Sequence, residues 1–210
     1  MVNLTGIPNG IKKLKFTLKH FKRTVYHHYG KSSLSYLKFL YYSGLKINTF
    51  FVYENDLMRE LPPHNLDPEF EVIKPTLEEL RNIRIGKNLP REFYYDELLN
   101  IRACYLAFYK GELAYIHWLF FKGDYSRFLI LSDRVAELNY NTTLPEFRRR
   151  RLSAKMMAYI SNDLQDSGYE KVMGVIHEGN IASIKCILQA GFKETRHIKA
   201  LGPLHRKLKV

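Results

Sequence analysis

The chain has 210 residues, of which 46% are hydrophobic and 14% aromatic, and its formal net charge is +12. This composition is typical of a globular protein. Two cysteines, Cys104 and Cys186, are too few for a disulfide framework, and no signal peptide or apolar run of about 18 residues is recognised. We therefore expect a protein of the reducing cytoplasm that does not cross a membrane.

The positive charge is concentrated at the start of the chain. Residues 1–53 contain nine Lys or Arg and no Asp or Glu, whereas the other 157 residues contain 24 basic and 21 acidic residues. Apolar residues at steps of three and four predict a helix with one apolar stripe, formed by Ile11, Leu14, Leu18, Phe21 and Val25. A second helix is predicted to begin at Ser32 or Ser33 and to end before Gly44.

Two interpretations of these basic helices stay open. In the first, the helices pack on the rest of the protein and their lysines are exposed to solvent. In the second, they form a binding surface for anionic lipid, nucleic acid or an acidic acyl carrier protein. The β-prone residues 49–53 and the chain-breaking residues 61–65 follow. We predict a basic helical N-terminal extension over residues 1–60 and a separate domain over residues 69–210.

The first part of this domain contains signals for strands, helices and a hairpin. Residues 70–73 predict a strand, and Thr76 with Glu79 forms a capping box that opens a helix. Residues 93–99 predict another helix. Residues 104–109 and 113–121 flank the turn residues 110–112 and predict a β-hairpin whose second strand is covered on both faces. Residues 127–132 are expected to add a strand.

A strand, a basic turn and a helix are predicted next. The strand covers residues 135–143, Pro145 follows, and an apolar stripe at helical spacing then runs from Leu152 to Leu164. Between them stand four consecutive arginines, from Arg148 to Arg151. Positive charge at a helix start opposes the helix dipole unless an anion is bound there, so these arginines and the helix N–H groups suit a phosphate or pyrophosphate. The alternative is a solvated basic helix start.

A second strand and helix complete the pattern. Residues 171–176 predict a buried strand, Asn180 is placed to cap a short helix, and Gly191 is placed to end it in the left-handed conformation.

The two strand–helix units resemble the two sequence motifs of the GNAT superfamily of acyl-CoA N-acetyltransferases. The matching residues are Pro145, Phe147 and Arg148 in the first motif and Asn180, Ser183, Gly191 and Phe192 in the second. Arg151 and Ser153 stand where the first motif usually has glycines. The resemblance implies an α/β fold with a mixed, mostly antiparallel sheet flanked by helices.

The resemblance also implies a function and a donor site. A GNAT enzyme transfers an acyl group, most often acetyl, from acyl-CoA to a primary amine by direct attack and needs no metal. The residues that the resemblance assigns to acetyl-CoA or another acyl-CoA donor are Thr143, Leu144, Arg148, Arg149, Arg150, Arg151, Leu152, Ser153, Asn180 and Ser183.

Catalytic and acceptor residues follow from the same resemblance. Glu137 is placed as the general base that removes the proton of the amine. Ile187 stands where the family commonly has a tyrosine general acid, so His177 and Cys186 are the substitutes nearest in sequence. The acceptor is expected to contact three aromatic residues, Tyr94, Tyr95 and Trp118.

Other functions remain possible. The chain could be a GNAT-fold binding module without catalysis, or a protein that binds an anionic membrane or RNA through its extension. The arginine cluster has no interleaved aromatic residues, which disfavours nucleic acid. The acceptor is not fixed by the sequence, and amino sugars and small amines are both candidates.

Overall fold

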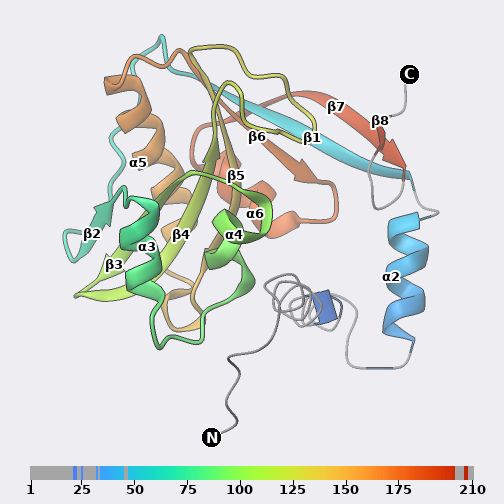
Figure 1. The fold of residues 1–210 in the computed structure, drawn as a ribbon. Coiled ribbons are helices and arrows are strands. Elements are labelled where there is room, and N and C mark those ends of the chain that lie inside the picture. The colour runs from blue at the N-terminus through green and yellow to red at the C-terminus, as the bar shows by residue number, and fades with distance from the viewer. Residues whose placement is uncertain are drawn as a thin grey trace, which may run out of the picture. The chain divides into compact units, whose positions relative to one another are not determined.

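A computed structural model describes residues 47–201, residues 34–44 and Phe21, Lys22, Val25, Ser32, Arg206 and Lys207 (Figure 1). The chain forms two compact units, residues 49–199 with 209–210, and residues 1–48 with 200–208. In the smaller unit α2 (Ser35–Gly44) confirms the second predicted helix, and the Phe21 ring lies 5.1 Å from that of Phe39. The first predicted helix lies mostly outside the described residues, and an anionic partner for the extension stays a prediction.

The larger unit is built on one mixed sheet. The strand order is β2-β3-β4-β5-β6-β1-β7, and β8 continues it next to the end of β7. The β5–β6 ladder is parallel, and the β2–β3, β3–β4, β4–β5 and β1–β6 ladders are antiparallel. The strands are β1 (Ile47–Asp56), β2 (Phe70–Ile73), β3 (Ala103–Tyr109), β4 (Glu112–Phe120), β5 (Val135–Thr143), β6 (Lys171–His177), β7 (Lys193–Leu201) and β8 (Arg206–Lys207). This confirms the predicted α/β class with a mostly antiparallel sheet.

β1 takes a position that the local sequence pattern does not show. It lies between β6 and β7, and its residues Phe50 to Asp56 pair with His177 to Lys171 of β6. The sequence analysis assigned this stretch to the N-terminal extension. In the structure its backbone hydrogen bonds are made within the sheet that carries the rest of the larger unit.

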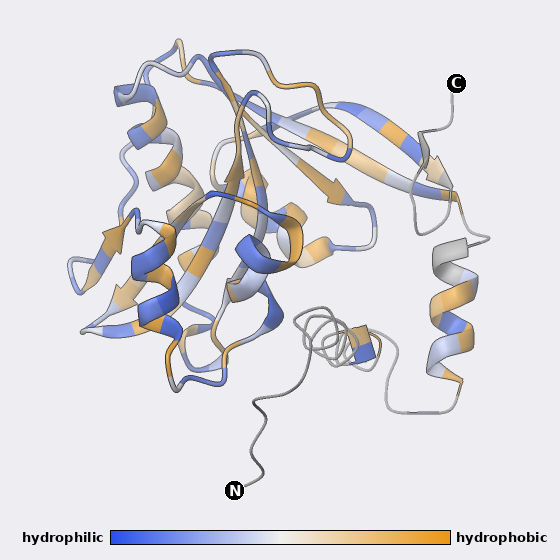
Figure 2. Cartoon of the chain, viewed as in Figure 1, coloured by the Kyte–Doolittle hydropathy of each residue, from blue (hydrophilic) through white to orange (hydrophobic). Residues whose placement is uncertain are grey.

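Two groups of helices cover opposite faces of the sheet. On one face, Asp163 of α5 (Leu152–Asp166) accepts a 2.5 Å hydrogen bond from the hydroxyl of Tyr105, and α6 (Ile181–Gln189) packs Ile187 on Gly174. The other face carries α3 (Leu77–Arg84), η1 (Arg91–Tyr94) and α4 (Tyr95–Leu99) (Figure 1), and their ribbons include both hydrophilic and hydrophobic residues in Figure 2. Every residue of β4 from Leu113 to Phe120 is buried, as expected for a strand covered on both faces.

Most of the predicted elements are confirmed, including the hairpin and the Thr76–Glu79 capping box. The strand expected at residues 127–132 is wrong, and side chains close local turns just before this stretch and at its start. The N–H of Phe121 donates to Asp124 at 2.8 Å, and the N–H of Leu129 donates to the Ser126 hydroxyl at 3.1 Å. Such side-chain bonds compete with a strand ladder.

Candidate active site

Strands β5 and β6 part in the middle of the sheet. Their parallel ladder ends at Leu138 and Gly174, although β5 continues to Thr143 and β6 to His177. On its other edge β5 stays paired with β4 up to Thr143, and the end of β6 stays paired with β1. The β6-facing edge of residues 139–143 therefore lies outside this ladder and can offer backbone groups to a ligand.

A β-bulge marks the point where the strands part. The β4–β5 register shifts between His117 and Trp118, which pair with Asn141 and Asn139. The extra residue, Tyr140, has a φ of +41°, and its N–H donates to the side chain of Asn139 at 2.9 Å. A non-glycine residue at positive φ is held there by its surroundings and is frequent at functional sites.

Glu137 is the buried carboxylate of this region. Its side chain is only 1% exposed, and one oxygen accepts a hydrogen bond from the amide of Asn139 at 3.1 Å. The other oxygen, Oε2, is buried and has no hydrogen-bond partner among the residues that the structure describes. Burial raises the pKa of Glu137 to about 7, and hydrogen bonds from Ser126 and Asn139 oppose this rise. A carboxylate with this pKa exchanges a proton near neutral pH, which is what a general base needs.

Aromatic rings and two arginines gather on the same face as Glu137. The Tyr140 ring lies 4.7 Å from that of Tyr95, and the guanidinium of Arg91 lies 5.5 Å from the Tyr95 ring. Burial raises the pKa of Tyr140, and the charge of Glu137 adds to this rise. The charges of Arg127 and Arg91 oppose it. The hydroxyl of Tyr140 therefore lies within electrostatic reach of one acidic and two basic side chains.

The arginine loop joins β5 to α5 through η2 (Pro145–Phe147). Arg149 and Arg151 have φ values of +66° and +57°, so Arg151 adopts the left-handed conformation that a glycine adopts without strain. All four arginines are exposed. Arg148 donates from Nε to the carbonyl of Thr143 at 3.1 Å, and the guanidinium of Arg150 lies 4.5 Å from the Tyr109 ring. The loop thus presents positive charge and left-handed backbone at the start of a 15-residue helix.

Polar contacts hold the start of α5 on the sheet face opposite Glu137. The hydroxyl of Ser153 donates to Asn141 at 3.4 Å. Deeper in the core the Tyr115 hydroxyl and Nδ1 of His117 are 2.7 Å apart, and burial lowers the pKa of His117 to about 3. His117 is therefore neutral at physiological pH. In the sequence, this pair is visible only as two polar residues two positions apart in a buried strand.

The other residues assigned to the acyl-CoA site have structural roles, which the sequence predicted in part. Thr143 is half-buried and Leu144 and Leu152 are buried, so the four arginines are the exposed part of this loop. Asn180 caps α6 by accepting from the N–H of Ser183 at 3.2 Å. The sequence placed both residues at a donor site, and the structure puts them at the first turn of α6.

Ile187, at the family's general-acid position, and its two substitutes, Cys186 and His177, differ in exposure. Ile187 is 2% exposed, and a Cβ added to Gly174 would lie 2.6 Å from its Cδ1. Cys186 is half-buried. The ring of His177 packs edge-on against Phe50 at 5.2 Å, and its Nδ1 accepts from the N–H of Gly179 at 3.0 Å. Alternation along β6 puts His177 on the same face as Met173, the register partner of Glu137.

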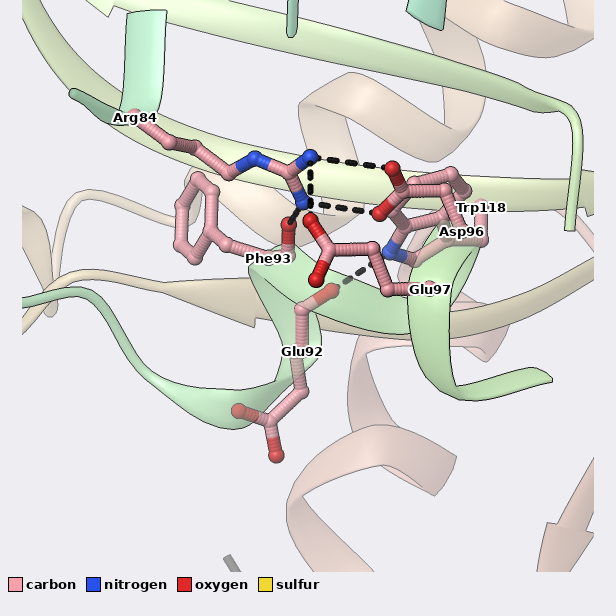
Figure 3. A network of polar contacts seen from close by, with 6 residues as sticks. All are labelled: Arg84, Glu92, Phe93, Asp96, Glu97 and Trp118. Atoms are coloured by element: carbon pink, nitrogen blue, oxygen red, sulfur yellow. Dashed lines mark hydrogen bonds and ion pairs between the residues drawn. The ribbon is translucent and has the colours of Figure 1, made fainter. Parts of the chain in front are cut away.

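The three expected acceptor residues are not equivalent. Tyr95 contacts Tyr140 in the candidate site, and Tyr94 is half-buried with the Arg84 guanidinium 4.9 Å from its ring. Trp118 is 0% exposed, and its Nε1 donates to the carbonyl of Glu92 at 2.6 Å (Figure 3). Trp118 therefore anchors η1 on the sheet and offers no surface to an acceptor.

A buried ion pair joins the helices that lie next to the candidate site. Arg84 of α3 donates to both oxygens of Asp96, at 2.7 and 2.9 Å, and to the carbonyl of Phe93 at 2.7 Å (Figure 3). It also reaches Glu97 at 3.2 Å. This network joins α3 to η1 and α4, which carry Arg91 and Tyr95.

Comparison with solved structures identifies the fold. A GCN5-related N-acetyltransferase from Sphaerobacter thermophilus aligns at a TM-score of 0.52 and 12% identity over 79% of this chain and 55% of its own. A GNAT-family acetyltransferase from Colwellia psychrerythraea aligns at 0.50 and 17% identity over 80% and 61%. The chain has the GNAT fold.

A third GNAT-fold neighbour is the GCN5-related glucosamine N-acetyltransferase region of a fungal multi-domain GH3 β-N-acetylglucosaminidase. It aligns at a TM-score of 0.56 and 15% identity over 80% of this chain and 23% of its own. The chain spans between about half and two thirds of the length of the first bacterial GNAT-fold chains that it matches. No protein-family model matches the sequence, and no curated protein sequence matches it.

Among the described residues no group of three or more His, Cys, Asp or Glu is arranged to hold a metal ion. In the same part of the chain, no helix has the length and apolar character required to cross a bilayer.

Proposed function

We propose that this protein is an N-acyltransferase, most simply an N-acetyltransferase, that moves an acyl group from acyl-CoA to a primary amine. The observation that carries the proposal is the buried Glu137 carboxylate, with its pKa of about 7, next to the point where β5 and β6 part. The GNAT fold is the frame in which this arrangement is interpreted.

The arginine loop is the proposed binding site for the diphosphate of the donor. Arg149 and Arg151 hold a left-handed backbone at the start of α5, and four guanidinium groups are exposed around it. Backbone N–H groups and arginines are the usual partners of phosphate oxygens. The β6-facing edge of residues 139–143 would accept hydrogen bonds from, and donate them to, the pantetheine arm. Bound acyl-CoA supplies an acyl carbon activated as a thioester.

Glu137 is the proposed general base. Among the described residues Oε2 has no hydrogen-bond partner, so it can accept one proton from a neutral primary amine that enters beside it. The nitrogen lone pair forms the bond to the acyl carbon, and the carbon–sulfur bond breaks. The amine proton goes to Glu137, and the thiolate takes a proton from water, since Ile187 cannot donate one. The hydroxide that remains takes the proton from Glu137, which restores the carboxylate.

Donor binding and turnover should be tested with separate measurements. Calorimetric titration with acetyl-CoA measures donor binding, and release of the CoA thiol with a panel of primary amines measures turnover. Glucosamine belongs to the panel because of the fungal neighbour. Donor binding without turnover of any amine would favour a GNAT-fold binding module, for which the buried Ile187 is the structural argument. No donor binding at millimolar concentration would contradict the proposal.

Glu137→Gln tests the base directly. We expect it to lower kcat by roughly 100- to 10,000-fold, the range of general base catalysis, and to leave the donor Kd unchanged. Glu146→Gln is the matched control, because Glu146 is exposed on the arginine loop. In the unmodified protein kcat/KM should rise with pH through an apparent pKa of about 7. Equal turnover by Glu137→Gln would assign the base elsewhere.

A further inference from the structure

We infer that the acceptor carries an anionic group, a carboxylate or a phosphate, besides its primary amine, and that Arg91 and Arg127 bind this group. The inference rests on the proposed function and names the class of its second substrate. It comes from the positive charges near Tyr140, which have no role in the proposed base or in the proposed acyl-CoA site.

The two arginines approach Tyr140 from different parts of the chain. Arg91 begins η1, and its guanidinium lies 5.5 Å from the ring of Tyr95, which is itself 4.7 Å from the ring of Tyr140. Arg127 comes from the loop before β5, where its guanidinium lies 5.3 Å from the Phe128 ring and 5.9 Å from the Phe50 ring. Aromatic rings therefore hold both guanidinium groups on the sheet face that carries Glu137.

Charges of both signs act on Tyr140. The pKa of Glu137 is raised by burial and lowered by Ser126 and Asn139. The pKa of the Tyr140 hydroxyl is lowered by the positive charges of Arg127 and Arg91 and raised by the negative charge of Glu137. One carboxylate and two guanidinium groups therefore lie within electrostatic reach of Tyr140. A ligand with an amine at one end and an anion at the other matches this arrangement, because unlike charges then face each other at both ends.

The arginines can serve a ligand while keeping their protein contacts. A guanidinium has five N–H donors in a planar fork that fits a carboxylate or phosphate with two parallel hydrogen bonds. Arg127 is partly withdrawn from water, and this burial lowers the pKa of its guanidinium. A bound anion would add a favourable interaction with this charge, whereas an amine without an anionic group would not.

Pairs of acceptors that differ by one anionic group test the inference. Phenylalanine is compared with phenethylamine, and glucosamine 6-phosphate with glucosamine, by thiol release from acetyl-CoA and by titration into the CoA-bound protein. Because hydrogen bonds to a charged partner are strong, we expect the anionic member of at least one pair to bind better than its neutral counterpart. Its kcat/KM and its affinity should each be about ten- to a hundred-fold higher.

Arginine variants locate the preference. Arg127→Gln and Arg91→Gln should each remove most of this preference, mainly through KM for the anionic member of the pair. Arg102→Gln, which changes an exposed arginine, is the control and should keep the preference.

The outcomes separate this inference from the proposed function. Turnover of amines with no preference for the anionic members would overturn the inference and leave the acyltransferase in place. Preferential binding of anionic members without any turnover would support the arginine site and contradict the enzyme. A preference that survives in Arg127→Gln and Arg91→Gln would also overturn the inference, since other residues would then bind the anion.

Discussion

The larger unit contains two buried carboxylates on one face of its sheet, and their surroundings are opposite. Asp96 is 8% exposed, and both of its oxygens accept hydrogen bonds from Arg84. Glu137 is 1% exposed, has no basic partner within hydrogen-bond distance among the described residues, and keeps one oxygen without a partner. Complete pairing is expected where a charge only supports the fold, whereas an unsatisfied buried group needs a separate explanation.

Positive φ angles also gather near the candidate site. Of the described non-glycine residues, six have positive φ, and Asn65, Asn100 and Lys110 among them lie far apart in the sequence. The other three, Tyr140, Arg149 and Arg151, fall within twelve residues of the chain, between the bulge of β5 and the start of α5. Strained backbone and an unpaired carboxylate therefore occur in one stretch, which is typical of a binding or catalytic site.

The largest effect is expected from breaking the paired carboxylate. Arg84→Met leaves Asp96 buried without its cation, and loss of one partner of a buried pair lowers the free energy of unfolding by about 3–5 kcal/mol. Urea denaturation measures this change. Arg81→Met, on the exposed side of the same helix, should change stability little. The double variant Arg84→Met, Asp96→Leu should recover much of the loss, and a loss below about 1 kcal/mol in the single variant would show that the pair is not structural.

Glu137 should behave in the opposite way, with an effect that depends on pH. Its pKa is about 7 in the folded protein and about 4.5 when unfolded, so its stabilising contribution is complete below pH 4.5 and is lost as the pH rises to 7. Glu137→Gln should therefore match the unmodified protein near pH 4. Near pH 8 the variant should be more stable by roughly 3 kcal/mol.

Urea denaturation of both proteins between pH 4 and pH 8 measures this difference. All other titratable groups are the same in the two proteins, so the difference between their free energies of unfolding reports on Glu137 alone. A difference that stays constant across this range would mean that Glu137 is solvated or paired in the folded protein. Its contrast with Asp96 would then disappear.

Much of the fold was predictable because its signals are local. The capping box at Thr76 and Glu79, the turn at Lys110 and Gly111, and the cap at Asn180 each depend on residues within a few positions of one another. β5 has the predicted bounds for the same reason, because a β-prone run ends there before Pro145. The GNAT fold followed from two such strand–helix units.

The features that were not predicted depend on contacts between distant parts of the chain. β1 joins the sheet beside β6, more than a hundred residues away, and no local pattern records that pairing. The burial of Trp118 depends on η1, which covers it through Glu92. The positions of Arg91 and Arg127 around Tyr140 likewise require three separate segments to meet. Candidate residues could be named from the sequence, but the faces on which they lie could not.

The smallest effect concerns the strained backbone of the arginine loop. An L-residue in the left-handed conformation is destabilised by roughly 1–2 kcal/mol, and glycine in the unfolded chain offsets about 0.5–1 kcal/mol of the gain from relieving it. Arg151→Gly should therefore raise the free energy of unfolding by up to about 1 kcal/mol. Arg150→Gly is the matched control, since Arg150 lacks positive φ and stacks on Tyr109. This control should lose stability instead. If both variants lose stability equally, the loop is not strained at Arg151, and the grouping of strain with the unpaired Glu137 would rest on Tyr140 and Arg149 alone.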